Sequence, residues 1–200
     1  MPEKSNKSFV IKLALILFAI TFIATLLLTL CNYITKDKIA LLEAQNAENA
    51  RQSVISGANF KKVDLDESLL KEHASCGTIE AYRADKNGEF AGYCISVAPT
   101  GYIGQINMIV GINPDLSFAG IKIISMSETP GLGAKATNKE FYGQFSEGKK
   151  GTLSVVKNQP APKENEINAV TGATITSKTI TKGANCALEI ATYLNESEAE

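Results

Sequence analysis

Apolar positions in this chain form one uninterrupted run near the start and a series of short alternating segments later. No charged residue occurs from Leu13 to Thr35, and a helix needs roughly 20 apolar residues to cross a bilayer. A cleaved signal peptide has an apolar core of only about 7–15 residues before a small-residue cleavage site, and no such site follows Leu30. The pattern predicts an uncleaved anchor over residues 13–35, embedded in the lipid bilayer.

The lysines that flank this run favour one orientation. Three lysines (Lys4, Lys7 and Lys12) precede it, and two follow it. Positive charge collects on the cytoplasmic side of membrane proteins. Residues 1–12 are therefore expected in the cytoplasm, and the main domain on the outer face of the cell (inner) membrane.

Two segments link the anchor to the later part of the chain. Residues 36–57 are rich in Ala, Leu, Glu and Gln, which predicts a helical stalk that ends near Ser56-Gly57. Residues 61–71 are charged with scattered Leu and Val, which predicts a loop and a short helix.

From Thr78 onward the pattern changes to short segments separated by turn residues. The turn Asn87-Gly88 is a strong hairpin signal. Strands joined by short turns predict an antiparallel sheet. The segments expected to form its strands are residues 78–84, 89–98, 103–112 and 117–126.

The last part of the chain predicts helices that pack on this sheet. A short helix is expected near residues 138–145, a strand at 152–156, a polar loop through Pro160 and Pro162, and a final helix at about 176–194. A sheet followed by packing helices gives the α+β class, with residues 58–200 as one extracytoplasmic domain. The apolar face of the final helix recurs at spacings of three and four: Ile180, Ala184, Ala187, Ala191 and Leu194.

Composition excludes several function classes. A net charge of −1 argues against binding of nucleic acid. One histidine and four scattered cysteines, with no C-x-x-C pair, argue against a metal site or an iron–sulfur cluster. Outside the cytoplasm Cys76 and Cys94 could pair, or the cysteines could be free and partly buried thiols. No Rossmann fingerprint for NAD and no hydrolase triad occurs, so no catalytic residue is assigned.

Two short motifs carry the candidate chemistry. In Thr171-Gly172-Ala173-Thr174 the small central residues allow a bulky group to approach, and Thr174 stands where the final helix begins. Helix N-termini favour phosphate, so a phosphate ester on Thr174 would lie in a favourable field. Thr176 adds a hydroxyl nearby. The competing hypothesis is a plain N-cap threonine.

The second motif is Ser127-Glu128-Thr129-Pro130-Gly131-Leu132-Gly133. Gly131 and Gly133 permit unusual backbone angles and close approach. Such a loop can lie along a planar ring, with Leu132 on the ring face and Glu128 and Thr129 at its polar edge. The competing hypothesis is an ordinary strand-to-helix turn.

Taken together, the motifs make the chain resemble the covalently flavinylated FMN-binding subunits of two membrane complexes. One is the G subunit of the Rnf-type ion-translocating ferredoxin:NAD oxidoreductase, and the other is the C subunit of the sodium-translocating NADH:quinone reductase. The family's attachment motif is Asp-x-x-Ser/Thr-Gly-Ala-Thr, and here Asn168 replaces the Asp. The Gly-Tyr-x-Gly turn at Gly101 also matches.

The resemblance implies a membrane-anchored electron-transfer subunit of a redox-driven translocase of Na⁺ or H⁺, with no complete active site of its own. FMN would be esterified through its phosphate to Thr174 by a flavin transferase. Other subunits of the complex would handle ferredoxin and NAD. The residues that the resemblance assigns to FMN are Thr174, Glu128, Thr129, Gly131, Leu132, Gly133, Thr171, Gly172, Ala173 and Thr176.

Three alternatives to the Rnf-type assignment remain open on the sequence alone. The chain could be the quinone reductase subunit, a stand-alone extracytoplasmic flavoprotein, or a membrane-tethered binding module without redox chemistry. The substitution at Asn168 keeps the size and one acceptor oxygen of Asp, so the attachment site is expected to survive it.

Overall fold

The computed structural model describes residues 3–146, 148–160 and 162–197. The chain forms two compact units, residues 1–45 and 46–200. Residues 1–2, 147, 161 and 198–200 lie outside the described residues; they belong to the segments that the sequence predicted at 1–12 and 58–200.

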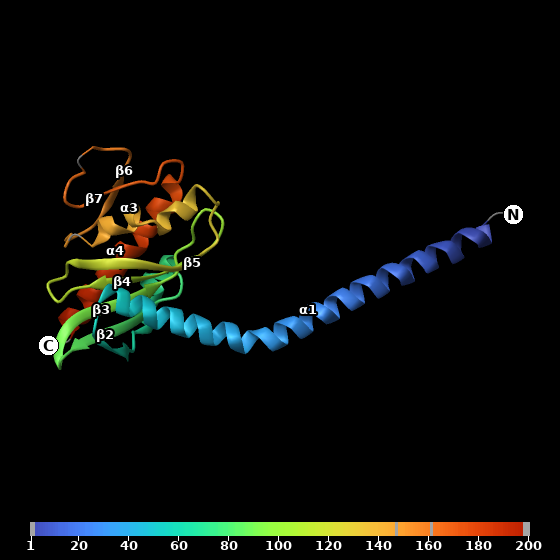
Figure 1. Cartoon of the computed structure of the whole chain (residues 1–200), viewed down its shortest axis with the longest axis horizontal. Coiled ribbons are helices and arrows are strands. Elements are labelled where there is room, and N and C mark those ends of the chain that lie inside the picture. Colours follow the sequence, from blue (N-terminus) through green and yellow to red (C-terminus); the bar gives the residue numbers. More distant parts are fainter. Residues whose placement is uncertain (1–2, 147, 161, 198–200) are drawn as a thin grey trace. The chain divides into compact units, whose positions relative to one another are not determined.

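Helix α1, Glu3–Val54, contains the predicted anchor and continues without a break through most of the predicted stalk (Figure 1). Its large apolar side chains are exposed, as Leu28 is at 71%. Three threonine hydroxyls, those of Thr21, Thr25 and Thr29, donate hydrogen bonds to backbone carbonyls of the preceding turn. Each hydroxyl therefore has a hydrogen-bond partner that does not depend on water. Among the described residues, α1 is the one helix that is long and apolar enough to cross a membrane. By length and composition, α1 can therefore serve as a membrane anchor.

The second unit is built on a five-stranded antiparallel sheet, with strand order β1-β2-β3-β4-β5. The turn between β2 and β3 has Asn87 at φ 54° and Gly88 at φ 86°, the positive angles that a two-residue hairpin requires. The four predicted strands are confirmed as β2 to β5, and each begins within a few residues of its predicted start. The strands are β1 Asn59–Val63, β2 Glu80–Lys86, β3 Glu89–Val97, β4 Ile106–Ile112 and β5 Phe118–Met126.

Strand β1 was not predicted, because residues 61–71 were expected to form a loop and a short helix. The short helix exists as α2, Glu67–Glu72, and is followed by the 3₁₀ turn η1, Ala74–Cys76. Strand β1 lies at the edge of the sheet and carries Lys61 and Lys62 on its exposed positions. An edge strand of this kind has no apolar alternation to reveal it.

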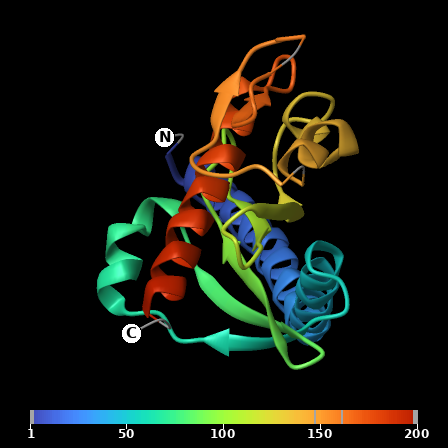
Figure 2. The same ribbon diagram turned by 90° about the vertical axis from the view of Figure 1, so that its left-hand side faces the viewer.

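Helix α4, Thr174–Ser197, lies across one face of the sheet (Figure 2). Its predicted apolar face is confirmed, since Ile180, Ala184, Ala187 and Ala191 are fully buried. This face packs in one core with the inward residues of β3 and β4, including Ile95.

A second core covers the opposite face of the sheet. Ala50 and Val54, in the last turns of α1, pack there with Cys94 and Ile109. Both faces of β3 and β4 are therefore covered, which explains why these strands contain near-continuous apolar runs.

The two cores decide the state of the cysteines. Cys76 belongs to the α4 core and Cys94 to the opposite one, so the sheet separates them. Of the two alternatives left open by the sequence, the Cys76–Cys94 pair is therefore wrong and free thiols are found. All four cysteines are free thiols. Burial raises the pKa of Cys94 to about 12. Cys76 instead has Cys186 of α4 as its neighbour, and the hydrogen bond between them lowers the pKa of Cys76 to about 7.

Short elements complete the domain between β5 and α4. The predicted helix near 138–145 appears as α3, Lys139–Tyr142, and the 3₁₀ turn η3, Gly143–Phe145, after an earlier 3₁₀ turn η2, Gly133–Thr137. The predicted strand at 152–156 is β6, Ser154–Val156. It pairs in parallel with β7, Glu166–Asn168, which was not predicted. The α+β class is confirmed.

Candidate functional site

Thr174 is the first residue of α4, and its side chain has no structural task. The amide of Ser177 donates to the carbonyl oxygen of Ala173 at 3.0 Å, so Ala173 occupies the cap position and Thr174 lies inside the helix. Within the described chain, the Thr174 hydroxyl makes no hydrogen bond. The N-cap hypothesis is therefore wrong, and this half-buried hydroxyl is available to carry a substituent.

The turn before Thr174 is held by a single side chain of α4. The Ser177 hydroxyl accepts a hydrogen bond from the Val170 amide at 3.0 Å and donates to the Ala173 carbonyl at 3.0 Å. The Ala173 amide donates to the Val170 carbonyl at 2.9 Å. These bonds hold the backbone on both sides of Gly172, whose φ of 79° suits glycine.

The loop at residues 128–133 lies against this turn. A Cβ placed on Gly172 would lie 2.9 Å from Cδ2 of Leu132, so the two sequence motifs are in contact. A Cβ on Gly133 would lie 2.8 Å from both the Glu128 side chain and the Thr176 hydroxyl oxygen. Gly133 is therefore required by the close packing of its neighbours.

Glu128 connects three segments of the site. The residue is 8% exposed. Its Oε1 accepts hydrogen bonds from the backbone amides of Tyr102 at 2.8 Å and Ile103 at 3.2 Å. Its Oε2 accepts the Thr176 hydroxyl proton at 2.8 Å, and Thr176 is 2% exposed. The carboxylate thus ties the Gly101 turn to the start of α4, a role that sequence reasoning did not assign to it.

These segments enclose a cavity of about 390 Å³, within the range of roughly 300–1,000 Å³ found for small-molecule sites. Thr171 faces a second cavity of about 300 Å³, which shares Gly172 and Thr174 with the first and adds Lys157 and Asn158. Gly131 lines neither of these two cavities. The first cavity is lined by Tyr102, Glu128, Thr129, Leu132, Gly133, Gly172, Ala173, Thr174, Ile175 and Thr176.

Three exposed apolar side chains, Tyr102, Leu132 and Ile175, line the first cavity, and exposed Ile103 follows Tyr102 in the chain. Tyr102 is 67% exposed, Ile103 60%, Ile175 54% and Leu132 45%. In the described part of residues 46–197, Tyr193 alone among the large apolar residues is comparably exposed elsewhere. We call Tyr102, Ile103, Leu132 and Ile175 the apolar rim. Soluble surfaces rarely concentrate apolar side chains in this way unless a ligand or partner covers them.

Tyr102 and Ile175 were not among the predicted site residues. An aromatic residue between two glycines in a turn, and an isoleucine directly after the Thr174 motif, were the available signals. Neither signal distinguishes an exposed contact residue from a buried one without the fold.

Positive charge lies on the Thr174 side of the domain. Lys157 lines the second cavity, and Lys178 stands one turn after Thr174 on α4. Helical side chains lean toward the N-terminus, so Lys178 leans toward Thr174. Neither ammonium group has an ion-pair partner within the described chain. No group of three or more potential metal ligands occurs among the described residues. The two lysines favour an anionic group near Thr174, and the apolar rim favours an apolar group beside it.

Comparison with known proteins identifies the class. Residues 101–189 match the FMN-binding domain family, from the Gly101 turn through most of α4. The crystal structure of NqrC from Shewanella oneidensis has the same fold, with a TM-score of 0.56, 17% sequence identity, and coverage of 75% of this chain and 88% of that one.

Two relatives identify the family more closely. The chain is 39% identical over 191 residues to the G subunit of the Na⁺-translocating ferredoxin:NAD⁺ oxidoreductase complex of Acetobacterium woodii, covering 90% of this chain and 91% of the relative. It is 34% identical over 181 residues to the G subunit of the proton-translocating complex of Clostridium ljungdahlii, covering 86% and 90%. The chain belongs to the family of G subunits of Rnf-type ion-translocating oxidoreductases, and the resemblance seen in the sequence is confirmed.

Proposed function

We propose that this chain is the electron-transfer subunit of an ion-translocating ferredoxin:NAD oxidoreductase complex and carries FMN as a phosphoester on Thr174. The observation that carries the proposal is the Thr174 hydroxyl, which makes no hydrogen bond within the described chain and stands at the edge of a cavity with an apolar rim. The other subunits of the complex are its partners.

The residues present fit both parts of FMN. The first cavity offers Leu132, Tyr102 and Ile175 to an aromatic ring, and covering these side chains gains about 25 cal/mol for each Å² of apolar surface removed from water. Gly172 and Gly133 also line this cavity, and their lack of a side chain lets Leu132, Glu128 and Thr176 pack closely beside it. The start of α4 and the nearby ammonium group of Lys178 favour the charge of a phosphodiester.

The attachment is a group transfer that leaves oxidation states unchanged. The Thr174 hydroxyl oxygen forms a bond to the flavin-side phosphorus of a flavin dinucleotide. The diphosphate bond of that donor breaks, and a nucleoside monophosphate leaves. A base of the flavin transferase takes the hydroxyl proton. In this step the Thr174 hydroxyl gives up no hydrogen bond to any other residue that the structure describes.

In the complex, bound FMN would supply one-electron chemistry, and the protein would supply placement. Helix α1 would hold the domain at the membrane, with residues 1–12 in the cytoplasm, 13–35 in the bilayer, 36–57 as a stalk and 58–200 outside. Glu128 keeps the walls of the cavity together through its three hydrogen bonds.

Substitution of Thr174 tests the proposal. The chain is co-expressed with the flavin transferase of its host, denatured, separated on a gel and viewed under ultraviolet light. We expect fluorescent bands for the wild type and Thr174→Ser, which keeps a hydroxyl, and a dark band for Thr174→Ala. Thr179→Ala, a matched change further along α4, should fluoresce like the wild type. Covalent flavin in Thr174→Ala would contradict the proposal, as would a dark wild-type band.

A further inference from the structure

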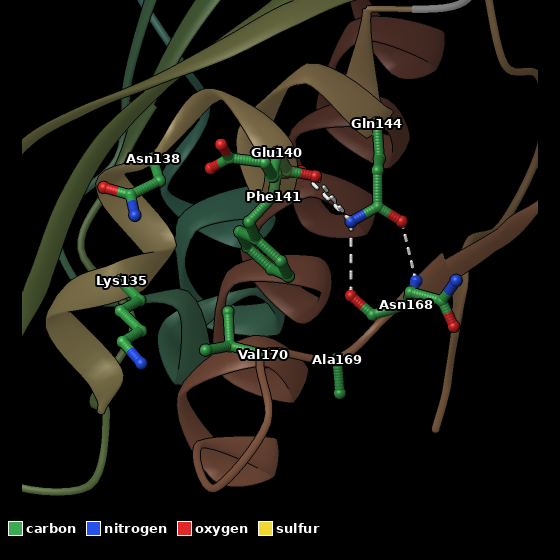
Figure 3. A pocket seen from close by; sticks show the side chains of 8 residues that line it. All are labelled: Lys135, Asn138, Glu140, Phe141, Gln144, Asn168, Ala169 and Val170. Atoms are coloured by element: carbon green, nitrogen blue, oxygen red, sulfur yellow. Dashed lines mark hydrogen bonds between the residues drawn. The ribbon is translucent and has the colours of Figure 1, made fainter. Parts of the chain in front are cut away.

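Strand β7 ends shortly before Thr174 and has one edge that no strand of the described chain pairs with. At that edge both backbone groups of Asn168 bind the side-chain amide of Gln144 (Figure 3). The Asn168 amide donates to Gln144 Oε1 at 2.7 Å, and its carbonyl oxygen accepts from Gln144 Nε2 at 3.2 Å. One side chain therefore pairs with this residue as a neighbouring strand would.

Gln144 is held firmly in this position. Its Nε2 also lies 3.3 Å from the carbonyl oxygen of Phe141 and 3.4 Å from that of Glu140. Phe141 is 4% exposed, and its ring packs edge-on against Phe145 with centroids 5.6 Å apart. The amide thus connects β7 to a well-packed part of the core.

The side chain of Asn168 makes a second amide pair, directed away from Gln144. Its Oδ1 accepts from the Gln159 backbone amide at 3.0 Å, and its Nδ2 donates to the Gln159 carbonyl oxygen at 2.8 Å. The pair closes the loop between β6 and β7. It needs a donor and an acceptor on one side chain, so a carboxylate at position 168 would place an oxygen against the Gln159 carbonyl oxygen.

From β7 the chain reaches Thr174 through a short turn that is fixed at both ends. The Ala169 amide donates to the Val156 carbonyl oxygen at 2.8 Å, on the β6 side. At the other end, the Ser177 hydroxyl holds the Val170 amide. The location of the turn therefore depends on where β7 is held.

We propose that Gln144 and Asn168 are positioning residues of the attachment site, which hold β7 so that the turn presents Thr174 to the flavin transferase. This inference rests on the proposed function. In this chain an amide at position 168 is required, and the aspartate of the family's motif would slow the modification.

Three matched amide-to-carboxylate changes in the full chain test this inference. Asn168→Asp removes the donor to Gln159, Gln144→Glu removes the donor to Asn168, and Asn195→Asp makes the same change near the other end of α4. Each protein in detergent micelles is incubated with flavin transferase and FAD. Covalent flavin per chain is followed against time by intact mass. Hydrogen exchange of the peptide covering residues 159–170 is measured on the unmodified chains.

A part-buried hydrogen bond changes an equilibrium by roughly two- to tenfold, and each site variant loses at least one. We expect Asn168→Asp and Gln144→Glu each to slow modification by about fivefold or more and to speed exchange in residues 159–170 by a similar factor. Asn195→Asp should match the wild type in both measurements.

Two results would overturn the positioning role alone. One is Asn168→Asp modified as fast as the wild type, and the other is slower modification with unchanged exchange, which would mean that the transferase reads Asn168 directly. A wild-type chain left unmodified at Thr174 would overturn the proposed function, and the positioning role with it.

Discussion

Replacing Glu128 with Ala should destabilise the domain, because one carboxylate holds three segments around the cavity. The change removes hydrogen bonds from the amides of Tyr102 and Ile103 and from the Thr176 hydroxyl. A hydrogen bond to a charged group contributes about 1.5–3 kcal/mol, and three of them would give an upper limit of roughly 5–9 kcal/mol.

The three bonds are not equivalent, so the expected loss is smaller. The amide hydrogen bonds of Tyr102 and Ile103 are only part-buried and lie in an exposed turn, so we expect water to replace the carboxylate there, which leaves about 1 kcal/mol for the pair. Thr176 is 2% exposed and loses its hydroxyl's partner, which costs about 1–2 kcal/mol. We expect Glu128→Ala to lower the free energy of unfolding by about 2–3 kcal/mol in total.

The assay is urea unfolding of the full chain in a mild detergent. The chain has no Trp and six Tyr, so tyrosine fluorescence reports the transition. Glu128→Gln should lose only about 1 kcal/mol, because Gln can accept from the amides and donate to the Thr176 oxygen. In a double-mutant cycle, Glu128→Ala and Thr176→Val together should cost less than the sum of the single changes by about 1 kcal/mol.

Two results would refute this reasoning. A loss below about 1 kcal/mol for Glu128→Ala would mean that the carboxylate contributes no more than an ordinary surface group. Strict additivity with Thr176→Val would mean that the hydrogen bond between the two residues does not couple the Gly101 turn to α4.

Two further predictions concern packing and the thiols. In Gly133→Ala the new Cβ would lie 2.8 Å from Glu128 and Thr176. We expect this change to lower the free energy of unfolding by about 1–3 kcal/mol and to reduce the amount of covalent flavin. An unchanged midpoint of urea unfolding, together with unchanged in-gel flavin fluorescence, would show that the loop adapts to the added methyl group. Cys76, Cys94 and Cys186 are at most 3% exposed, so at pH 8 a maleimide should label none of them in the folded chain and all three in urea, despite the lowered pKa of Cys76. Rapid labelling of Cys94 in the folded chain, detected by peptide mass, would contradict the two-core packing.

The sequence predicted those parts of the fold that have a strong periodic pattern. The apolar run of α1, the hairpin at Asn87-Gly88 and the apolar face of α4 all lie where the pattern placed them. Strand β1 was missed because it is an edge strand with exposed lysines, and β7 because it is only three residues long. Short segments of this kind depend on tertiary pairing more than on their own propensity.

For the site, the motifs identified the right segments and gave only part of their roles. Thr174 and Leu132 lie at the same cavity, as the motif pair implied. The sequence placed Glu128 at the polar edge of a ring, but its hydrogen bonds to Tyr102 and Thr176 need a fold to become visible. The amide pairs of Asn168 were equally hidden, because both partners come from other segments and one is backbone.

The measurement that tests the central claim most directly is the mass of the peptide containing Thr174, taken from the chain purified from its native membrane. The account predicts a peptide heavier by FMN less one water, with fragmentation that places the addition on Thr174 and leaves Thr171 and Thr176 unmodified. An unmodified Thr174 peptide, or the flavin found on a different residue, would contradict it.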